Sequence, residues 1–279
     1  MTGIIGILLI IANIAFSYKG FTDFVFFDKY KFEVDKILIE KQYYRLISSG
    51  FLHINWQHLI FNMISLYFFS AVVESQLGEI CFLVVYFVSL IGGDLLALLV
   101  HRHHGDYSSV GASGAICGII FASIALYPGM RINFFFLPIG IPSWLYGVVY
   151  IAYSIYGIHS KRDNIGHEAH LGGALIGMLA AIIIVPSTLL HNYLPIAFIL
   201  IPTLIFIYLI ITRPHILLVD NFFFRKQKKY EPIDYKYNEE RLSKQQEVDR
   251  LLDKIGKKGM SSLTAQEKQT LEEYSKTIR

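Results

Sequence analysis

Residues 111–127 read GASGAICGIIFASIALY, a cluster of small residues followed by an apolar helix. The run from Ser113 to Tyr127 has 15 residues and spans roughly 22 Å as a helix, whereas the hydrocarbon layer of a membrane is roughly 30 Å thick. If this helix reaches the far interface, Ser113 lies below the membrane surface and the polar segment 101–110 must dip inward. Irregular backbone at that depth needs protein or water to satisfy its amides, so we predict a hydrated cavity inside a membrane protein.

The composition on both sides of this stretch is that of a membrane protein with a soluble tail. Of the 279 residues, 54% are hydrophobic and 17% are charged, with a mean hydropathy of +0.46, whereas soluble domains carry about 25% charge. Ten of the 25 Lys and Arg residues lie in the first 212 residues and 15 lie from Arg213 onward. The net charge of +3 is small and confined to the tail, so it gives no reason to expect a nucleic-acid partner.

Seven apolar segments are long enough, or nearly so, to cross a bilayer as helices. The first has neither a basic leader nor a small-residue cleavage site, so we expect a retained helix rather than a signal peptide. The chain is therefore predicted to be an all-α membrane protein. The segments are Gly3–Tyr18, Gln57–Val73, Ile80–Val100, Ser113–Tyr127, Trp144–Ile158, Ala169–Val185 and Pro195–Ile211.

Polar residues inside these spans are costly, and they therefore mark candidate functional positions. His58 and Asn62 are four residues apart and share one helix face, where they could serve a site or simply bond a neighbouring helix. Asp94 is either a structural or cavity-facing carboxylate or a catalytic one, and the first reading is favoured. Ser113 and the pair His167 and His170 complete the set.

Two Gly-xxx-Gly pairs lie in the predicted helices, and such pairs favour close helix contact: Gly114 with Gly118, and Gly173 with Gly177. If these two faces meet, the beginnings of both helices meet as well. The Ser113 hydroxyl would then lie beside the His170 imidazole. A cluster of small residues can also serve packing alone, so this juxtaposition is the hypothesis on which the function depends.

A serine hydroxyl becomes a nucleophile when a nearby histidine takes its proton. The oxyanion formed on attack needs donors, which the Ser113 N–H and the side chains of His58 and Asn62 could provide. No third, orienting carboxylate is evident in the sequence. These groups, all in membrane helices, suggest peptide-bond hydrolysis within the bilayer.

The same residues, between about Arg45 and Ala180, resemble the rhomboid family of intramembrane serine proteases. The resemblance rests on several short motifs that occur in the family's order, and together they are far more specific than any one of them. The matching positions are Tyr44 and Arg45 in place of the family's Trp-Arg, His53, His58 and Asn62, Glu74 and Gly78, Gly111, Ser113 and Gly114, and Ala169, His170, Gly173 and Gly177.

The resemblance implies a six-helix core with a Ser–His dyad that opens to one aqueous face and cleaves single-pass membrane proteins in or near their transmembrane helices. It makes Ser113 the nucleophile, His170 the general base and acid, and His58 and Asn62 the oxyanion donors. Residues 22–49 resemble the family's partly embedded first loop. Neither a metal nor an organic cofactor is implied.

The sequence departs from the family pattern at one position near the dyad. Relatives often carry an aromatic residue four positions after the nucleophile, stacked on the catalytic histidine, and this chain has Cys117 there. The orientation of His170 must then be held in another way.

His167 and His170 stand three apart, which does not fit the HExxH zinc motif, and we expect His167 to be a loop residue at the cavity mouth.

We predict three parts in the chain: a rhomboid-like membrane protease domain at 1–212, a basic and aromatic linker at 213–237, and a C-terminal helical hairpin at 238–279. In the hairpin, Thr264 and Glu267 form a capping box. The hairpin is either a docking element for an unknown protein or a solvated appendage. Segment 195–211 is expected to add a seventh transmembrane helix to the core.

We expect a multi-pass protein of the bacterial inner membrane. In the orientation that is usual for this family, Arg131 is the one basic residue that lies clearly on the cytoplasmic side. The positive-inside rule expects basic residues in the cytoplasmic loops, so it favours the opposite orientation. Two other functions are considered beside the protease. A catalytically idle relative would bind transmembrane helices without the dyad, and a metal transporter would use His101, His103 and His104.

Overall fold

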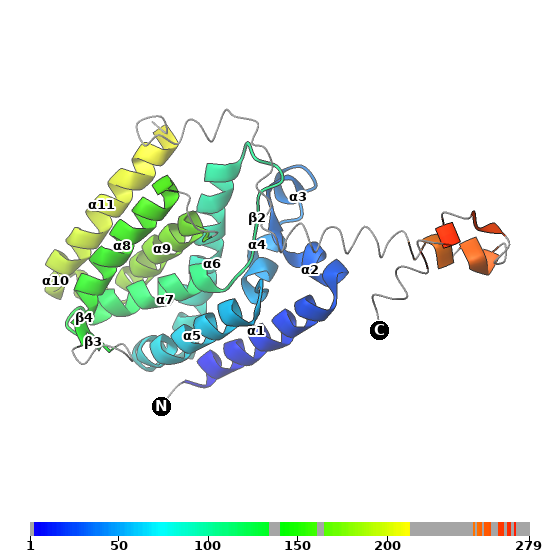
Figure 1. The fold of residues 1–279 in the computed structure, drawn as a ribbon. Helices are drawn as coiled ribbons and strands as arrows, with labels where there is room; N and C mark the ends of the chain where they lie inside the picture. The colour runs from blue at the N-terminus through cyan, green and yellow to red at the C-terminus, as the bar shows by residue number, and fades with distance from the viewer. Residues whose placement is uncertain are drawn as a thin grey trace. The chain divides into compact units, whose positions relative to one another are not determined.

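A computed structural model of the chain describes residues 3–133, 140–160 and 165–212, and in the tail 248, 250–252, 254–257, 262–264, 267–268 and 271. The chain divides into two compact units, Met1–Arg225 and Lys226–Arg279, here called the membrane unit and the tail unit. Figure 1 shows the membrane unit as a bundle of helices, and the strands among its described residues are very short. The predicted linker at 213–237 lies outside the described residues.

Each of the seven predicted apolar segments forms a helix, and the described part of the membrane unit is an all-α membrane fold. Five of these helices are long and apolar enough to cross a membrane, and α7 is a shorter apolar helix. The bounds are α1 Ile4–Thr22, α5 Trp56–Leu77, α6 Glu79–His101, α7 Ser113–Leu126, α8 Ser143–Ser160, α9 His167–Ile184 and α11 Tyr193–Thr212.

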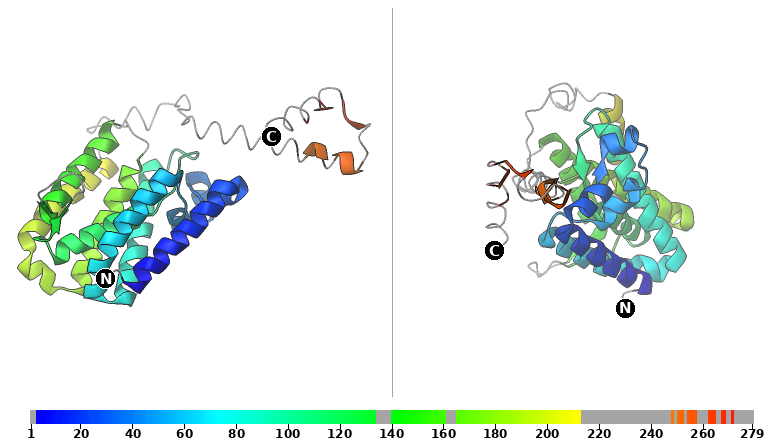
Figure 2. Two further views of the ribbon diagram at one scale, coloured as in Figure 1. Left: turned by 60° about the horizontal axis from the view of Figure 1, so that its bottom comes forward. Right: turned by 90° about the vertical axis from the view of Figure 1, so that its right-hand side faces the viewer.

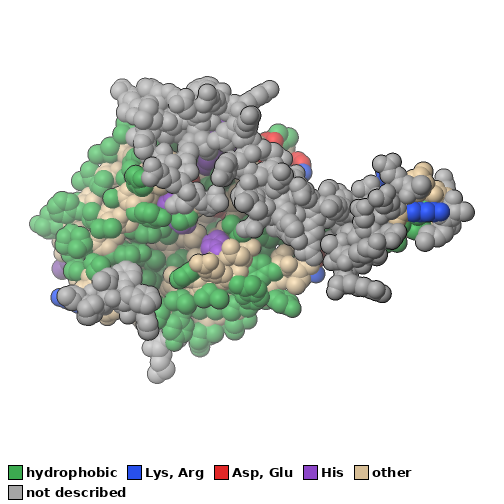
Figure 3. Space-filling view, in the orientation of Figure 1, with side chains coloured by type: hydrophobic (Ala, Val, Ile, Leu, Met, Phe, Trp, Pro, Cys, Tyr) green, Lys and Arg blue, Asp and Glu red, His purple; other side chains and the backbone are tan. Residues whose placement is uncertain are grey.

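The outer surface of these helices is apolar. Ile80 of α6 and Ile183 of α9 are 79% and 77% exposed, and hydrophobic side chains cover much of the coloured surface of the membrane unit in Figure 3. So extensive an apolar surface is unfavourable in water and is typical of helices that face lipid. The membrane unit is therefore an integral, multi-pass membrane protein.

Helix α7 lies at the centre of the membrane unit. Its residues from Gly114 to Ala125 are all buried, and a helix that is hydrophobic all round belongs in a core. It packs against α5, α6 and α9, while α1 packs on α5 and α11 packs on α8, an arrangement visible in Figures 1 and 2. The short helix is thus surrounded by protein, and its first residue is held by its neighbours.

The segment between α1 and α5 is a folded structure of short elements. It contains α2 Phe24–Tyr30, α3 Val34–Leu38, α4 Arg45–Ser48 and the 3-10 helix η1 Ser49–Phe51. Strand β1, Phe32–Glu33, pairs antiparallel with β2, Ser108–Ser109, in the segment that leads into α7. The first loop is therefore tied by backbone hydrogen bonds to the loop that presents Ser113.

Two further connections complete the membrane unit, one between α7 and α8 and one between α9 and α11. Strands β3, Arg131–Ile132, and β4, Ile141–Pro142, pair antiparallel between α7 and α8. The short helix α10, Ser187–His191, precedes α11, and the sequence analysis did not foresee it. The side chain of Asn192, just after α10, donates from Nδ2 to the carbonyl oxygen of Ala125 at 2.8 Å.

The tail unit contains the capping box expected from its sequence. The Thr264 N–H donates to Glu267 Oε2 at 2.8 Å, and the Glu267 N–H donates to Thr264 Oγ1 at 3.3 Å. The Lys254 ammonium pairs with the Glu267 carboxylate at 2.7 Å. Among the described tail residues, 248, 250–252, 254–257, 267, 268 and 271 are helical, and the beginning of the predicted first helix, 238–247, lies outside them.

Candidate active site

Two glycine pairs bring the first halves of α7 and α9 together. A Cβ atom added at Gly173 would collide with the backbone of Gly114, whose carbonyl carbon would lie 2.7 Å away. A Cβ at Gly177 would collide with the backbone of Gly118. Helix backbones approach this closely only where side chains are missing. The contact between the two Gly-xxx-Gly faces is therefore confirmed.

This contact places Ser113, the first residue of α7, opposite His170 in the first turn of α9. The Ser113 Oγ lies 2.7 Å from His170 Nε2, which is a hydrogen-bond distance. Both side chains are partly buried. The positive ends of two helices converge here and favour a developing negative charge. A hydroxyl bonded to an imidazole is the arrangement that nucleophilic catalysis requires.

His58 and Asn62 lie on α5 next to this pair. A Cβ added at Gly111, whose φ is +135°, would lie 2.8 Å from His58 Cε1 and 3.6 Å from Ser113 Oγ, so His58 and Ser113 both adjoin Gly111. The Asn62 side chain is 8% exposed, and its Nδ2 is buried with no acceptor among the described residues. A buried donor without a partner is costly, and it fits a group that waits for an oxyanion. The roles of both residues stay predictions.

His53 is a buried residue whose ring packs against the ring of His58. Its side chain is fully buried, its Nδ1 is 2.9 Å from Ser17 Oγ, and its ring lies edge-on to the His58 ring at 4.9 Å. Burial, with a smaller contribution from His58, lowers the pKa of His53 to about 3, so His53 is neutral at physiological pH. Sequence reasoning missed Ser17 as its partner, since a serine in an apolar helix carries no signal of its own.

Tyr150 of α8 is a further residue that the sequence analysis missed. Its hydroxyl oxygen is 3.0 Å from His170 Nδ1 and 3.0 Å from Cys117 Sγ. His170 is expected to be held in another way because residue 117 is not aromatic, and in the structure Tyr150 contacts its ring nitrogen. The four tyrosines of α8 signalled an aromatic helix, but no spacing in the sequence says which of them faces the histidine.

Arg45 organises the first loop rather than the reacting centre. Its guanidinium is 3% exposed, and its Nη1 donates to the carbonyl oxygens of Asp28 at 2.8 Å and Lys31 at 2.7 Å. A planar group with several donors is well suited to bond two backbone carbonyls at once. The Arg45 position in the motif therefore fixes the shape of the loop beside the site.

Two buried carboxylates join helices together. Glu74 accepts hydrogen bonds from the backbone N–H groups of Ile5 at 3.0 Å and Gly6 at 2.9 Å, and it thereby caps the beginning of α1. Asp94 accepts a hydrogen bond from the Ser49 hydroxyl at 2.9 Å and so connects α6 to η1. The structural reading of Asp94 agrees with this contact.

The expectation for His167 is wrong. His167 is the first residue of α9 rather than a loop residue, and it is only 2% exposed. The helix begins three residues before His170, so the His167 ring points into the protein, edge-on to Tyr153 at 5.1 Å. Within the described ranges, no group of three or more His, Cys, Asp and Glu residues is arranged to hold a metal ion.

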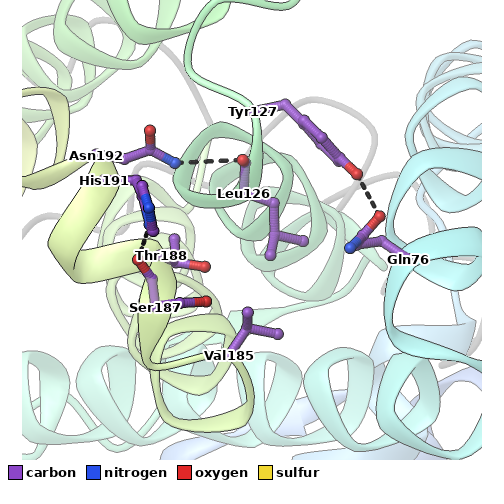
Figure 4. A pocket seen from close by; sticks show the side chains of 8 residues that line it. All are labelled: Gln76, Leu126, Tyr127, Val185, Ser187, Thr188, His191 and Asn192. Carbon is purple, nitrogen blue, oxygen red and sulfur yellow. Dashed lines mark hydrogen bonds between the residues drawn. The ribbon is translucent and has the colours of Figure 1, made fainter.

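A pocket of about 300 Å³ lies at the opposite ends of α7 and α9. Figure 4 shows its lining, with Asn192 bonded to Leu126 and Tyr127 bonded to Gln76. The last residues of α7 lie about 20 Å along the helix from Ser113. This pocket is therefore separate from the Ser113–His170 pair.

Two family models match different parts of the chain. The family model for the rhomboid domain matches residues 40–187, and a family of unknown function (DUF6576) matches residues 231–277 in the tail. These two matches cover different parts of the chain, and the first contains Ser113 and His170.

Several curated proteins are similar to the chain. RHOMBOID-like protein 12, mitochondrial, of Arabidopsis thaliana is 28% identical over 63% of this chain and 56% of its own length. Rhomboid protein 1, mitochondrial, of Saccharomyces cerevisiae is 30% identical over 51% of this chain and 43% of its own length. Rhomboid protease AarA of Providencia stuartii is 30% identical over 63% of this chain and 69% of its own length.

The chain spans about half the length of the two mitochondrial relatives. The match to the rhomboid domain nevertheless extends over the helices that carry the glycine contacts, the serine and the histidine. The rhomboid model covers more than half of the residues, and the helical membrane fold is the one that this match requires. The chain therefore belongs to the rhomboid family.

Proposed function

We propose that this protein is an intramembrane serine protease that hydrolyses peptide bonds in or near the transmembrane helices of single-pass membrane proteins. The observation that carries the proposal is the 2.7 Å hydrogen bond between Ser113 Oγ and His170 Nε2, at the beginnings of two helices that cannot move apart without losing their glycine contacts. The similarity to Rhomboid protease AarA of Providencia stuartii supports the same activity.

The reaction follows from the position of these groups. As Ser113 Oγ bonds to the carbonyl carbon of the substrate, its proton passes to His170 Nε2. The carbonyl oxygen becomes an oxyanion, for which the Ser113 N–H and the side chains of His58 and Asn62 are the proposed donors. When the C–N bond breaks, the imidazolium gives its proton to the departing amine. Water then hydrolyses the acyl-serine ester by the same steps, with His170 as base.

The test uses the full-length protein in liposomes with a fluorescently labelled single-pass model substrate. We expect cleavage by the wild type and none above background by Ser113→Ala or His170→Ala. Ser75→Ala is the matched control, because this exposed serine on α5 donates only to the backbone of its own helix. Cleavage retained in either dyad variant would refute the proposal. A wild type that binds the substrate without cutting it would instead identify an idle helix-binding relative.

Two finer parts of the proposal concern location and the tail. We propose the inner membrane of a bacterium as the location, supported by the similarity to a Providencia stuartii protease, although relatives of this family also occur in mitochondria. We also propose that residues 238–279 dock a partner protein. A chain that lacks 238–279 should cleave the model substrate normally but should no longer co-purify with a partner protein that the full chain recovers. Unchanged co-purification would refute the docking role.

A further inference from the structure

The two ring nitrogens of His170 face different partners. Nε2 lies 2.7 Å from Ser113 Oγ, and Nδ1 lies 3.0 Å from the hydroxyl oxygen of Tyr150. A neutral imidazole carries a proton on one nitrogen and a lone pair on the other. To accept the serine proton, Nε2 must carry the lone pair, so Nδ1 must carry the proton and donate it. The group beside Nδ1 must then act as an acceptor.

Serine proteases of other folds meet this need with a buried carboxylate, which holds the imidazole in the required tautomer. In this chain the phenolic oxygen of Tyr150 stands beside His170 Nδ1. A phenol can accept or donate, so by itself it does not select a tautomer. A second partner of the phenol has to decide the direction.

Cys117 is that second partner. Its Sγ lies 3.0 Å from the Tyr150 hydroxyl oxygen, and the cysteine is 4% exposed. A hydroxyl has one hydrogen, and if this hydrogen points toward sulfur, an oxygen lone pair faces Nδ1. The hydrogen bonds then run in one direction, from Ser113 to His170, from His170 to Tyr150, and from Tyr150 to Cys117. The reverse arrangement would put a hydrogen on Nε2 and leave the serine without a base.

The positions of the helices support a geometric role for Tyr150. Ser113 and Cys117 are one turn apart on α7, so the serine and the sulfur that terminates the chain of bonds share one rigid element. The tyrosine ring lies nearly parallel to the imidazole ring, at an interplanar angle of 29° and a centroid distance of 6.4 Å. Tyr150 thus contacts His170 from α8, while the nucleophile approaches it from α7.

We propose that Tyr150 is a positioning residue for His170, and that Cys117 accepts the tyrosine hydrogen and so keeps the histidine in the tautomer whose Nε2 is the base. This inference rests on the proposed protease function and names the group that holds the base of that same site. In this chain a residue of α8, rather than an aromatic residue at position 117 of α7, contacts and orients the His170 ring.

The first experiment compares Tyr150→Phe with the wild type in the liposome cleavage assay. The substitution keeps the ring and removes the hydroxyl, so kcat should fall roughly tenfold to a hundredfold, as for a lost hydrogen bond to a group that becomes charged, while KM stays within about twofold. Tyr156→Phe is the matched control, since Tyr156 lies on the same helix and is 54% exposed. A wild-type kcat in Tyr150→Phe would overturn the inference.

The role of Cys117 is tested by two substitutions of similar size. Cys117→Ser keeps an acceptor for the tyrosine hydrogen and should retain kcat within about threefold, because a hydroxyl can replace the sulfur. Cys117→Ala removes the acceptor, frees the Tyr150 hydrogen to turn toward Nδ1, and should lower kcat by roughly tenfold. Equal kcat values in the two variants would show that the sulfur does not direct the tyrosine.

A second readout does not depend on proteolysis. In full-length protein labelled with ¹⁵N-histidine, the His170 signals are those that disappear in His170→Ala. We expect the Nδ1–H tautomer in the wild type and a mixture of tautomers in Tyr150→Phe. If the wild type fails to cleave but shows this dependence, the proposed function fails and the positioning role stands. If cleavage is normal and the tautomer is unchanged in Tyr150→Phe, the positioning role fails alone.

Discussion

Substitution of Gly173 by alanine perturbs the helix contact that sets the Ser113–His170 distance. Gly173 lies one turn after His170 on α9, and the new Cβ would lie 2.7 Å from the carbonyl carbon of Gly114. Carbon atoms at rest are about 3.5–4.0 Å apart, so the helices must separate locally by about 1 Å. A misplacement of about 1 Å can cost about a hundredfold in rate. Overpacking of this kind costs about 1–3 kcal/mol in stability.

The assay measures both quantities on the same preparations. We expect Gly173→Ala to lower kcat about a hundredfold per folded molecule and to lower the melting temperature followed by circular dichroism. Gly129→Ala is the matched control, because a Cβ at Gly129 has no neighbour within 4 Å. A folded Gly173→Ala protein with normal melting and wild-type cleavage would refute the reasoning, because the backbone contact would then not determine the position of His170.

Three further predictions concern other parts of the chain. Asn62→Ala should lower kcat by about 10²–10³-fold with little change in KM, as for the loss of one oxyanion donor, and unchanged kcat would exclude Asn62 from that role. Asn192→Ala removes the donor to the Ala125 carbonyl and should lower the free energy of unfolding by about 1 kcal/mol with normal cleavage per folded molecule; a loss of cleavage without a loss of stability would contradict this. The hydrogen bond from Lys254 lowers the pKa of Glu267 to about 2, against about 4.3 in an unfolded chain. This contact therefore stabilises the tail above pH ~4 and is lost as the pH falls toward 2. Carbon-13 NMR of the full-length protein should place the Glu267 titration midpoint near 2, and a midpoint near 4.3 would contradict the contact.

The helices and the central pair of residues could be predicted from the sequence because their signals are local. Apolar runs give the spans directly. The spacing of Gly114 and Gly118, repeated in Gly173 and Gly177, predicts which helix faces meet, and the structure has this contact. The capping box at Thr264 is equally local, and its two reciprocal hydrogen bonds are present.

The structure of the first loop could not be predicted in the same way. Its short helices have little intrinsic stability in isolation, and they are held by long-range contacts. The Arg45 guanidinium bonds to carbonyls 14 and 17 residues earlier, and β1 pairs with residues far along the chain at 108–109. No periodicity in residues 22–49 indicates these partners.

Tyr150 escaped prediction for a related reason. Because residue 117 is a cysteine rather than an aromatic residue, another group must hold His170, but the sequence does not say which element supplies it. The rotation of α8 about its axis decides which tyrosine faces the imidazole, and packing against α9 and α11 sets that rotation. His167 was misplaced because the beginning of α9 was expected at Ala169, and one additional half-turn of helix buries its ring.

The most direct test of the central claim is labelling of the full-length protein in liposomes with a fluorophosphonate probe, which reacts with an activated serine. The account predicts that mass spectrometry finds one modified residue, Ser113, in the wild type, and none in Ser113→Ala or His170→Ala. Labelling of Ser113 that is equally rapid in His170→Ala would contradict the account, because the hydroxyl would then not depend on the imidazole 2.7 Å away.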